Sequence, residues 1–212
     1  MRYAGRFNMA EINSSFHRPH RPSTCERWTA ESPEGFRFAA KLPKTITHER
    51  RLVDTGSDLI PFLDAVGALG HKLGPLLIQL PPSLIFDREV AQAFLGLFRS
   101  RWDHALACEP RHPTWFGEAA ETVLHDHEVA RVAADPARVP QAAEPGGWPG
   151  LRYVRLHGSP RMYYSRYDET YLAELAARVA TPSVETWCVF DNTASGAACA
   201  NALELLALTT GR

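Results

Sequence analysis

Strand-like and helix-like segments alternate along almost the whole chain, and this alternation constrains the fold more than any other feature of the sequence. Seven short apolar segments are typical of strands: residues 8–13, 37–42, 76–80, 105–109, 129–135, 153–157 and 186–192. Helical signals separate most of them, and a helix between two strands lets the chain return to start a parallel neighbour. The sequence therefore predicts an α/β protein with one parallel sheet.

Helix starts are predicted from capping signals. Ser23 and Glu26 have the capping-box spacing, so a helix is expected to begin at Ser23. Ser57, Asp87 and Asp168 each precede apolar residues at helical spacing and indicate three more starts.

Two further segments complete the pattern. An Ala- and Leu-rich run that follows residues 194–196 and continues to Leu208 predicts a final helix. The Pro- and Gly-rich interval 136–150 is expected to be a surface loop and not a domain linker, because the same rhythm resumes after it.

Composition limits the classes of protein that fit. The chain has 212 residues, of which 45% are hydrophobic, and this is enough for the core of one domain. Lys and Arg (23) nearly balance Asp and Glu (24), so net charge does not favour nucleic acid or anionic membranes. No apolar stretch is long enough to span a bilayer, the first residues lack a signal-peptide core, and the four cysteines form no C-x-x-C pair. A cytoplasmic protein is expected.

Polar residues recur where the predicted strands end: Glu11, Asn13, Lys41, Gln79, Glu109, Asp135, His157, Asp191 and Asn192. In a (β/α) barrel the carboxyl ends of all strands meet at one face, where active sites are built. We therefore expect one pocket lined by Glu11, Lys41, Gln79, Glu109, Asp135, His157 and Asn192. The alternative is that each polar residue only begins a solvated loop.

Side-chain alternation supports a sheet with two different faces. Phe38 and Leu42 share one face of their strand and are expected to meet helices, whereas Lys41 lies on the other face. Arg155 likewise shares a face with His157.

Seven motifs occur in order along almost the whole chain. They are E-I-N-S-S-F-H-R (11–18), G-F-R-F-A-A-K-L-P-K-T-I-T-H-E-R-R-L (35–52), K-L-G-P-L-L-I-Q-L-P-P-S (72–83), E-P-R-H-P-T-W-F (109–116), A-A-D (133–135), Y-V-R-L-H-G (153–158) and F-D-N-T-A-S-G-A-A (190–198). Together they resemble the motifs of the YecE-like family of (β/α) barrels of the TIM type, for which no biochemical function is agreed. The resemblance implies one such domain over residues 1–212.

Two departures from the family pattern change this expectation. Family members normally start with a strand similar to G-T-S-G-W, followed by a loop and a helix, and that unit is missing ahead of Tyr3. An incomplete barrel of seven strands is therefore expected, with its gap between the first and last strands. Either the recorded start lies downstream of the true one, or the chain is a shortened form. His17 also stands where relatives usually carry Tyr.

The catalytic candidates are Glu109, Asp135, His157, Lys41 and Glu11. Glu11, Glu109 or Asp135 could act as general base and His157 or Lys41 as acid. The candidates for ligand binding are Asn13, His48, Gln79, Arg111, His112, Arg155, Tyr163, Tyr164 and Asn192. The two arginines suit an anionic or polyhydroxyl ligand, and the tyrosines suit stacking on a ring.

A divalent metal is a conditional alternative. Glu109, Asp135, His157 and Asp191 carry the donors that such an ion needs, and their order resembles that of xylose-isomerase-like barrels. Lys41 and Arg111 argue against it, because they could pair with the same carboxylates.

Three functional hypotheses follow. The first is an enzyme that acts on a small polar or anionic substrate by acid/base or metal-assisted chemistry. The second is a module that binds a nucleotide or a nucleic-acid end, which net charge does not support, and the third is an inactive truncated form. A small-molecule ligand and no membrane are expected, and the oligomeric state stays open. For the enzyme, Glu109→Gln is expected to abolish activity with little effect on the melting temperature, and Trp115→Ala to lower stability.

Overall fold

The structure is a computed structural model that describes residues 3–180 and 184–210. Its strands are β1 (Met9–Ile12), β2 (Arg37–Lys41), β3 (Leu73–Gln79), β4 (Leu106–Glu109), β5 (Val129–Arg131), β6 (Ala133–Asp135), β7 (Gly146–Gly147), β8 (Leu151–Leu156) and β9 (Glu185–Phe190). The helices are α1 (Pro22–Glu31), α2 (Gly56–Gly67), α3 (Arg88–Arg99), α4 (Glu118–Asp126), α5 (Glu169–Val179) and α6 (Ala197–Thr210). Short turns of helix lie at η1 (Ser14–Phe16), η2 (Thr45–Glu49), η3 (Gly70–Lys72), η4 (Pro113–Phe116) and η5 (Pro140–Ala143).

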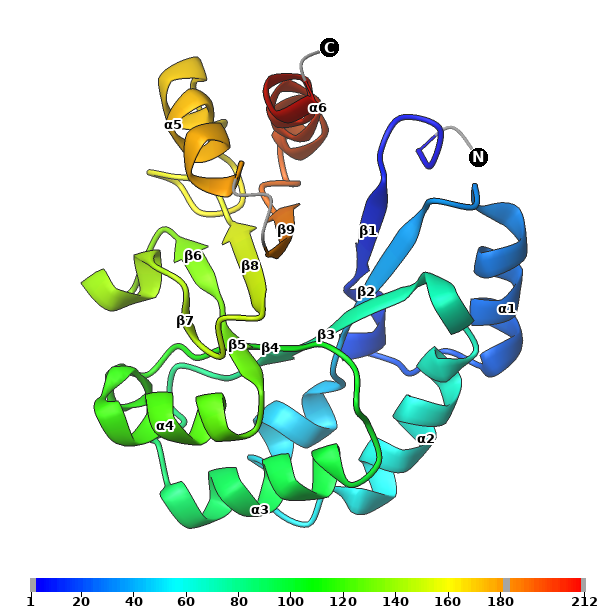
Figure 1. The fold of residues 1–212 in the computed structure, drawn as a ribbon, viewed down its shortest axis with the longest axis vertical. Helices are drawn as coiled ribbons and strands as arrows, with labels where there is room; N and C mark the ends of the chain where they lie inside the picture. The colour runs from blue at the N-terminus through cyan, green and yellow to red at the C-terminus, as the bar shows by residue number, and fades with distance from the viewer. Residues whose placement is uncertain (1–2, 181–183, 211–212) are drawn as a thin grey trace.

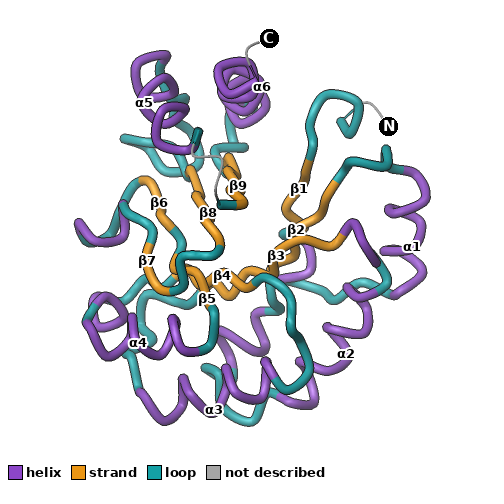
Figure 2. The backbone as a smooth tube through the Cα atoms, viewed as in Figure 1, coloured by secondary structure: helices purple, strands orange, loops and turns teal. Residues whose placement is uncertain are grey.

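The strands form two sheets, both mostly parallel. One has the order β1-β2-β3-β4-β5-β7 and the other the order β6-β8-β9. Figures 1 and 2 show the strands curving around a common interior with the helices outside. In the described residues β1 pairs only with β2 and β9 only with β8, so the ring is not closed into a barrel.

The prediction of one wholly parallel sheet is wrong, because the strands form two sheets and one pair of neighbours is antiparallel. The strand predicted at 129–135 is divided at Val132, and β5 and β6 pair with different sheets. The predicted loop 136–150 contributes β7, which runs antiparallel to β5. Gly147 has a φ of +63°, and a Cβ atom there would lie 2.5 Å from the carbonyl oxygen of Val129. Only glycine permits this close antiparallel approach.

The capping predictions succeed at two helices and fail at two. Asp87 and Asp168 each accept a hydrogen bond from a backbone amide in the first turn of α3 and α5, as predicted. No side-chain cap precedes α2, which begins at Gly56 and not at Ser57, or α1, which begins at Pro22 and not at Ser23. Proline suits the first helical position because its fixed φ is already helical and its missing N–H is not needed there.

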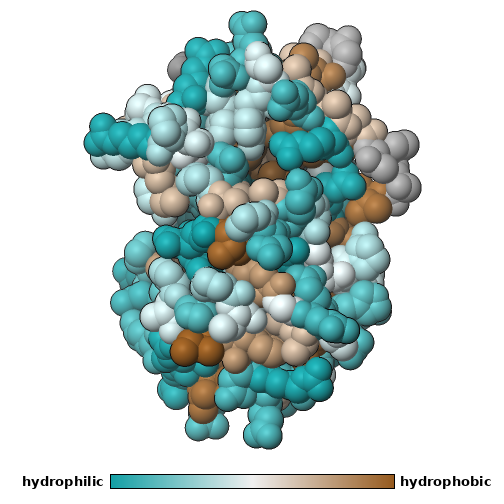
Figure 3. Space-filling model, turned by 90° about the vertical axis from the view of Figure 1, so that its left-hand side faces the viewer, coloured by the Kyte–Doolittle hydropathy of each residue, from teal (hydrophilic) through white to brown (hydrophobic). Residues whose placement is uncertain are grey.

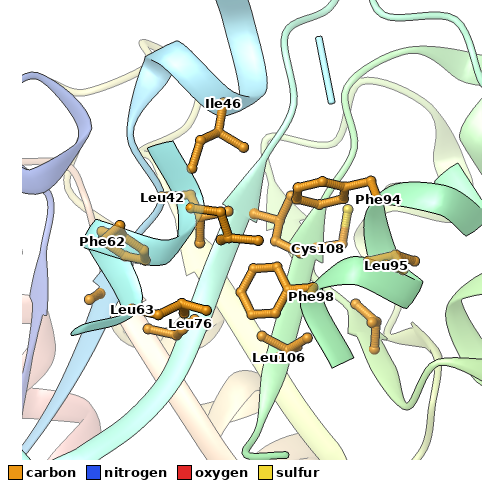
Figure 4. Close-up of a cluster of buried hydrophobic side chains, with 14 of the residues drawn as sticks. Leu42, Ile46, Phe62, Leu63, Leu76, Phe94, Leu95, Phe98, Leu106 and Cys108 are labelled. Atoms are coloured by element: carbon orange, nitrogen blue, oxygen red, sulfur yellow. The ribbon is translucent and has the colours of Figure 1, made fainter. Parts of the chain in front are cut away.

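The outer core lies between the six-stranded sheet and α1–α4. Phe38, Ala40 and Leu42 point into it from β2 and the residue after it, which confirms the predicted face. Figure 4 shows Leu42 and Leu76 from the sheet region with Phe62 of α2 and Phe98 of α3. Each buried Leu or Phe contributes roughly 1.5–3 kcal/mol by leaving water, so this layer holds the helices on the sheet.

The interior that the two sheets share is small and apolar toward the amino ends of the strands. Its buried members are Ala39, Leu77, Ala107, Ala130, Val132, Leu151, Tyr153, Trp187 and Val189. Two residues further along several of these strands, the inward positions become charged or polar. The side-chain period of two therefore places a polar layer directly above an apolar one.

The outside of the molecule carries few large apolar groups. Figure 3 shows one face on which hydrophilic residues predominate and hydrophobic ones form small, separate patches. Among the described helices, none has both the length and the apolar character required to cross a membrane.

Candidate functional site

Seven charged side chains meet at the carboxyl ends of the strands and are called the charged cluster below: Glu11, Lys41, Glu109, Arg111, Arg155, His157 and Asp191. Most of them lie on the inward positions of β1, β2, β4 and β8 or directly after a strand end. Hydrogen bonds and ion pairs join all of them except Lys41, which is linked by charge.

Arg155 is the centre of the charged cluster and has no exposed surface. Its Nη2 lies 2.7 Å from Oε1 of Glu11 and its Nη1 lies 2.7 Å from Oε2 of Glu109. A weaker contact of 3.4 Å reaches Oδ2 of Asp191. Burial alone would lower the pKa of Arg155, but Glu11 and Glu109 raise it well above its ordinary value. Arg155 is thus a permanent internal cation and is not exposed to a ligand.

Glu109 uses both of its oxygens. Oε1 accepts from Arg111 at 3.1 Å and lies 3.2 Å from Nε2 of His157, while Oε2 accepts from Gln79 at 2.9 Å and from Arg155. Burial would raise the pKa of Glu109, but Arg155, the hydrogen bond with His157 and Arg111 hold it well below 4.5. Glu109 is therefore an ionised anchor for these cations, which differs from the general-base role suggested by the sequence.

His157 is held between two carboxylates. Its Nδ1 lies 3.1 Å from Oδ2 of Asp191 and its Nε2 faces Glu109, so both ring nitrogens can donate when the ring is protonated. Burial lowers the pKa of His157, but the bonds with Asp191 and Glu109 raise it above 6.5 overall. Burial raises the pKa of Asp191, and His157 and Arg155 lower it overall. These contacts favour the protonated ring of His157 beside the partly exposed, ionised Asp191.

Lys41 is the exception in the charged cluster. It is only 8% exposed, and its Nζ lies 4.0 Å from the centre of the Phe16 ring. Among the described residues, Nζ has no hydrogen-bond partner. Burial and Arg155 lower the pKa of Lys41 to about 8, although Glu109 and Glu11 act in the opposite direction. Lys41 therefore titrates close to neutral pH.

The turn after β1 positions Phe16 beside this lysine. Oγ of Ser15 lies 2.7 Å from the carbonyl oxygen of Lys41 and 2.8 Å from that of Ile12, so it ties the ends of β1 and β2 together. His48 packs edge-on against Phe16, with ring centres 4.9 Å apart. Burial, Lys41 and Arg111 lower the pKa of His48. Through its contact with Phe16, His48 lies on the Lys41 side of the charged cluster.

Two predicted residues lie elsewhere. Asp135 accepts a hydrogen bond of 2.7 Å from the hydroxyl of Tyr167 and faces a separate cavity of about 290 Å³. The Nδ2 atom of Asn192 donates to the carbonyl oxygen of Ser165 and to Oδ1 of Asn201. Both residues fasten the chain around α5 and α6, so their predicted place with the other strand-end residues is wrong.

The remaining candidates for ligand binding are spread around the rim. His112 caps η4 through Thr114, which is a local structural role. Asn13 lines the groove between β1 and β9, and its Oδ1 is buried without a donor in the described residues. Tyr163 and Tyr164 are 39% and 45% exposed, and the Tyr163 ring is 6.0 Å from that of His157.

The residues that the structure describes do not form the single shared pocket that the sequence predicts. Glu11 and Asp191 line a cavity of about 490 Å³ between β1, β9 and α6, and Glu109, Arg111 and His157 line a smaller, separate one. The strand-end residues are therefore linked to one another by hydrogen bonds, but they do not line one cavity.

The four residues proposed as metal ligands do not fit a divalent ion. Arg155 occupies the space among Glu11, Glu109 and Asp191, and Asp135 lies apart. No group of three or more His, Cys, Asp or Glu side chains in residues 3–180 and 184–210 is placed to hold a metal ion.

Sequence reasoning missed Tyr153 and Phe16. The Tyr153 hydroxyl donates a 2.7 Å hydrogen bond to Glu11, and burial together with Glu11 raises its pKa well above the ordinary value. The available signal was the alternation that places Tyr153, Arg155 and His157 on one face. Nothing local marked Phe16 as a neighbour of Lys41.

Comparisons with known proteins agree with this architecture. A family described as "Protein of unknown function DUF72" matches residues 1–211. The UPF0759 protein YecE of Escherichia coli K12 is 31% identical over 148 residues, which are 68% of this chain and 54% of the relative. The chain thus matches about half of that relative's length.

Two solved structures have a similar fold. A DUF72 family protein from Enterococcus faecalis V583 has a TM-score of 0.83 and 21% identity, with 99% of this chain and 92% of that chain covered. A DUF72 family protein from Thermotoga maritima MSB8 has a TM-score of 0.79 and 25% identity, with 96% and 85% covered.

Proposed function

Because the chain belongs to the DUF72 family, whose description names no activity, we propose from its own residues that it is an enzyme for a small, anionic, polar substrate. Acid/base chemistry at the Lys41 side of the charged cluster carries the reaction. The single observation behind this proposal is Lys41, a nearly buried ammonium group whose Nζ has no hydrogen-bond partner in the described part of the chain. An ammonium group that has lost most of its contact with water is costly, so a bound anion would relieve part of that cost.

Arg111 is the natural second contact for the substrate. Its side chain is 15% exposed while its guanidinium is held by Glu109 at 3.1 Å, so it is oriented and still accessible. A planar guanidinium binds carboxylates and phosphates in a defined geometry. Lys41 and Arg111 together favour an anionic group on the substrate.

Proton transfer falls to Lys41 and to the pair of His157 and Asp191. A pKa of about 8 lets Lys41 give or accept a proton near neutral pH. Asp191 is 23% exposed at its side chain, and it connects the buried His157 to the groove. Glu109 and Arg155 act by holding this arrangement.

The proposal extends to the architecture. The strands are an open form of a parallel (β/α) barrel of the TIM type, with the gap at the groove between β1 and β9. The shared apolar interior of the two sheets and the polar layer above it support this assignment. An active site at the carboxyl ends of the strands is the usual arrangement in that fold.

A thermal-shift screen with small carboxylates, phosphate esters and neutral sugars tests the function. Anionic compounds should raise Tm, because a ligand at 100 times its Kd adds about 2.7 kcal/mol to the free energy of unfolding. That gain corresponds to roughly 5–10 °C for a domain of this size.

The variants make the screen specific. Lys41→Met should remove the shift, whereas Lys44→Met should keep it, because Lys44 is a surface residue paired with Glu49. Shifts that persist in Lys41→Met, or that neutral sugars match, would contradict the proposal.

A second function is favoured by one observation. The guanidinium of Arg161 stacks on the Tyr164 ring at 3.9 Å, beside the exposed Tyr163, and such a surface can stack on a base. Binding of a short oligonucleotide that weakens steeply with salt and is lost in Tyr164→Ala would support a nucleic-acid-end module.

A further inference from the structure

The chain has three lysines. Two of them, Lys41 and Lys72, are buried, but their Nζ atoms differ in their hydrogen-bond partners. Lys72 is 3% exposed, and its Nζ donates to the carbonyl oxygens of Thr29 and Ser32 and to Oγ of Ser32 at 2.7–3.1 Å. All three of its N–H groups have acceptors, as a structural ammonium requires. Lys41 is similarly enclosed, but its Nζ lies over the face of Phe16 and has no hydrogen-bond acceptor in the part of the chain that the structure describes.

The surroundings of Lys41 favour a neutral amine. Burial is the largest cause of its lowered pKa, and the guanidinium groups of Arg155 and Arg111 act in the same direction, while the opposing carboxylates of Glu11 and Glu109 are already paired with arginines. With a pKa of about 8, roughly a tenth of the side chain is neutral at pH 7. A neutral lysine amine is a nucleophile.

The amine is also not fully enclosed, since Lys41 is 8% exposed. Nζ of Lys41 is not one of the fully enclosed polar atoms that lack a partner in the described residues, so it keeps some contact with solvent. Lys41 is the last residue of β2, and the amine therefore lies at the carboxyl-end face with the rest of the charged cluster.

We propose that Lys41 forms a covalent imine with an aldehyde or ketone that carries a carboxylate or phosphate group. The inference rests on the proposed function and names its substrate class. The amine attacks the carbonyl carbon, a C–N bond forms, and the carbonyl oxygen leaves as water with the two amine hydrogens. The step is neither an oxidation nor a reduction and needs no co-reactant.

The neighbouring groups fit this step. Arg111 is placed to bind the anionic substituent. A proton taken up from solvent on the imine nitrogen gives the iminium cation, which the negative charges of Glu11 and Glu109 stabilise. An iminium ion draws electrons from the adjacent bond, so the class of reaction is proton removal or bond cleavage next to the former carbonyl carbon. The partly exposed carboxylate of Asp191, with His157 behind it, can accept such a proton.

Reductive trapping tests the imine. The whole chain is incubated with pyruvate, glyoxylate or dihydroxyacetone phosphate and sodium cyanoborohydride, which converts an imine to a stable secondary amine. Peptide mapping by mass spectrometry then measures the labelled fraction at Lys41, Lys44 and Lys72. The expected result is labelling of Lys41 in at least tenfold excess over Lys44, with a rate that rises as pH increases toward about 8.

The outcomes separate the imine from the proposed function. Equal labelling of Lys41 and Lys44, or none, overturns the imine. If an anionic carbonyl compound nevertheless raises Tm in the wild type and not in Lys41→Met, the proposed function stands without the imine. If neither labelling nor a Tm shift occurs, both are wrong. The distribution of label among the three lysines is measured in the wild-type protein, so this test does not depend on whether any variant folds.

Discussion

Arg155 and Glu11, 144 positions apart in the chain, form a two-bond ion pair with distances of 2.7 and 3.1 Å. Both side chains are 1% exposed. The pair joins β8 to β1 and therefore bridges the two sheets across their shared interior. Because β1 has a strand neighbour on one side only, this contact is a main restraint on its inner face.

Removal of Arg155 should be strongly destabilising. Arg155→Met leaves Glu11 and Glu109 as buried carboxylates without their main cation, and the free energy of unfolding should fall by about 3–5 kcal/mol. Urea denaturation measures this change. Arg27→Met on the exposed side of α1 is the control and should change stability by less than about 0.5 kcal/mol. A small effect at Arg155 would mean that the charged cluster relaxes without it.

Glu109→Gln should also unfold more easily, which reverses the expectation from the sequence. The new amide would turn donors toward groups that already donate, namely Gln79, Arg111 and Arg155. We expect a loss of about 3–5 kcal/mol, measured by urea denaturation, against no change in the exposed Glu174→Gln. An unchanged melting temperature would support the expectation from the sequence, in which Glu109 serves catalysis and contributes little to stability.

The charge on His157 should make stability depend on pH. Its pKa is raised above 6.5 in the folded protein, so its contribution is fully present below pH 6.5 and is lost as pH rises through the folded pKa. The difference in free energy of unfolding between wild type and His157→Gln should therefore be largest near pH 6 and shrink at higher pH. Subtraction cancels the other histidines, and a difference that grows with pH would refute this assignment.

The two buried lysines should respond in opposite directions. Lys41→Met removes a poorly solvated charge, and since its folded pKa lies below the ordinary 10.5, stability at pH 7 should rise by about 1–3 kcal/mol. Lys72→Met leaves the acceptors of Thr29 and Ser32 without a donor, so stability should fall by about 1–3 kcal/mol. Thermal and urea unfolding of both variants measures the contrast. Parallel changes would mean that Lys41 is a structural ammonium.

Trp115→Ala should reduce stability without altering the reactivity of Lys41. The ring is 3% exposed, packs edge-on against Phe86 at 5.0 Å and donates to the carbonyl oxygen of Leu84. The cavity should lower the free energy of unfolding by about 3–5 kcal/mol. Labelling of Lys41 per folded molecule should be unchanged, and its loss would connect the outer core to the site.

Much of the fold is predictable from the sequence because it depends on local geometry. The alternation of strands and helices, the caps at Asp87 and Asp168, and the inward face of Lys41, Arg155 and His157 all follow from backbone periods and short-range hydrogen bonds. The division of the strand at Val132 does not follow, because it depends on the glycines of β7 reaching β5 from another segment.

The same division holds for the site. Local pattern was sufficient to indicate which strand ends carry charge, but only tertiary structure decided which charges pair. Asp191 joins His157, whereas Asp135, also an aspartate at a strand end, accepts a hydrogen bond from Tyr167 outside the charged cluster. Glu109 is an anchor because four hydrogen-bond donors converge on it. The Lys41 amine has no hydrogen-bond partner in the described residues because the neighbouring carboxylates are paired with arginines. Burial and pairing are long-range properties, and they set the protonation state of each group, which the residue type alone leaves open.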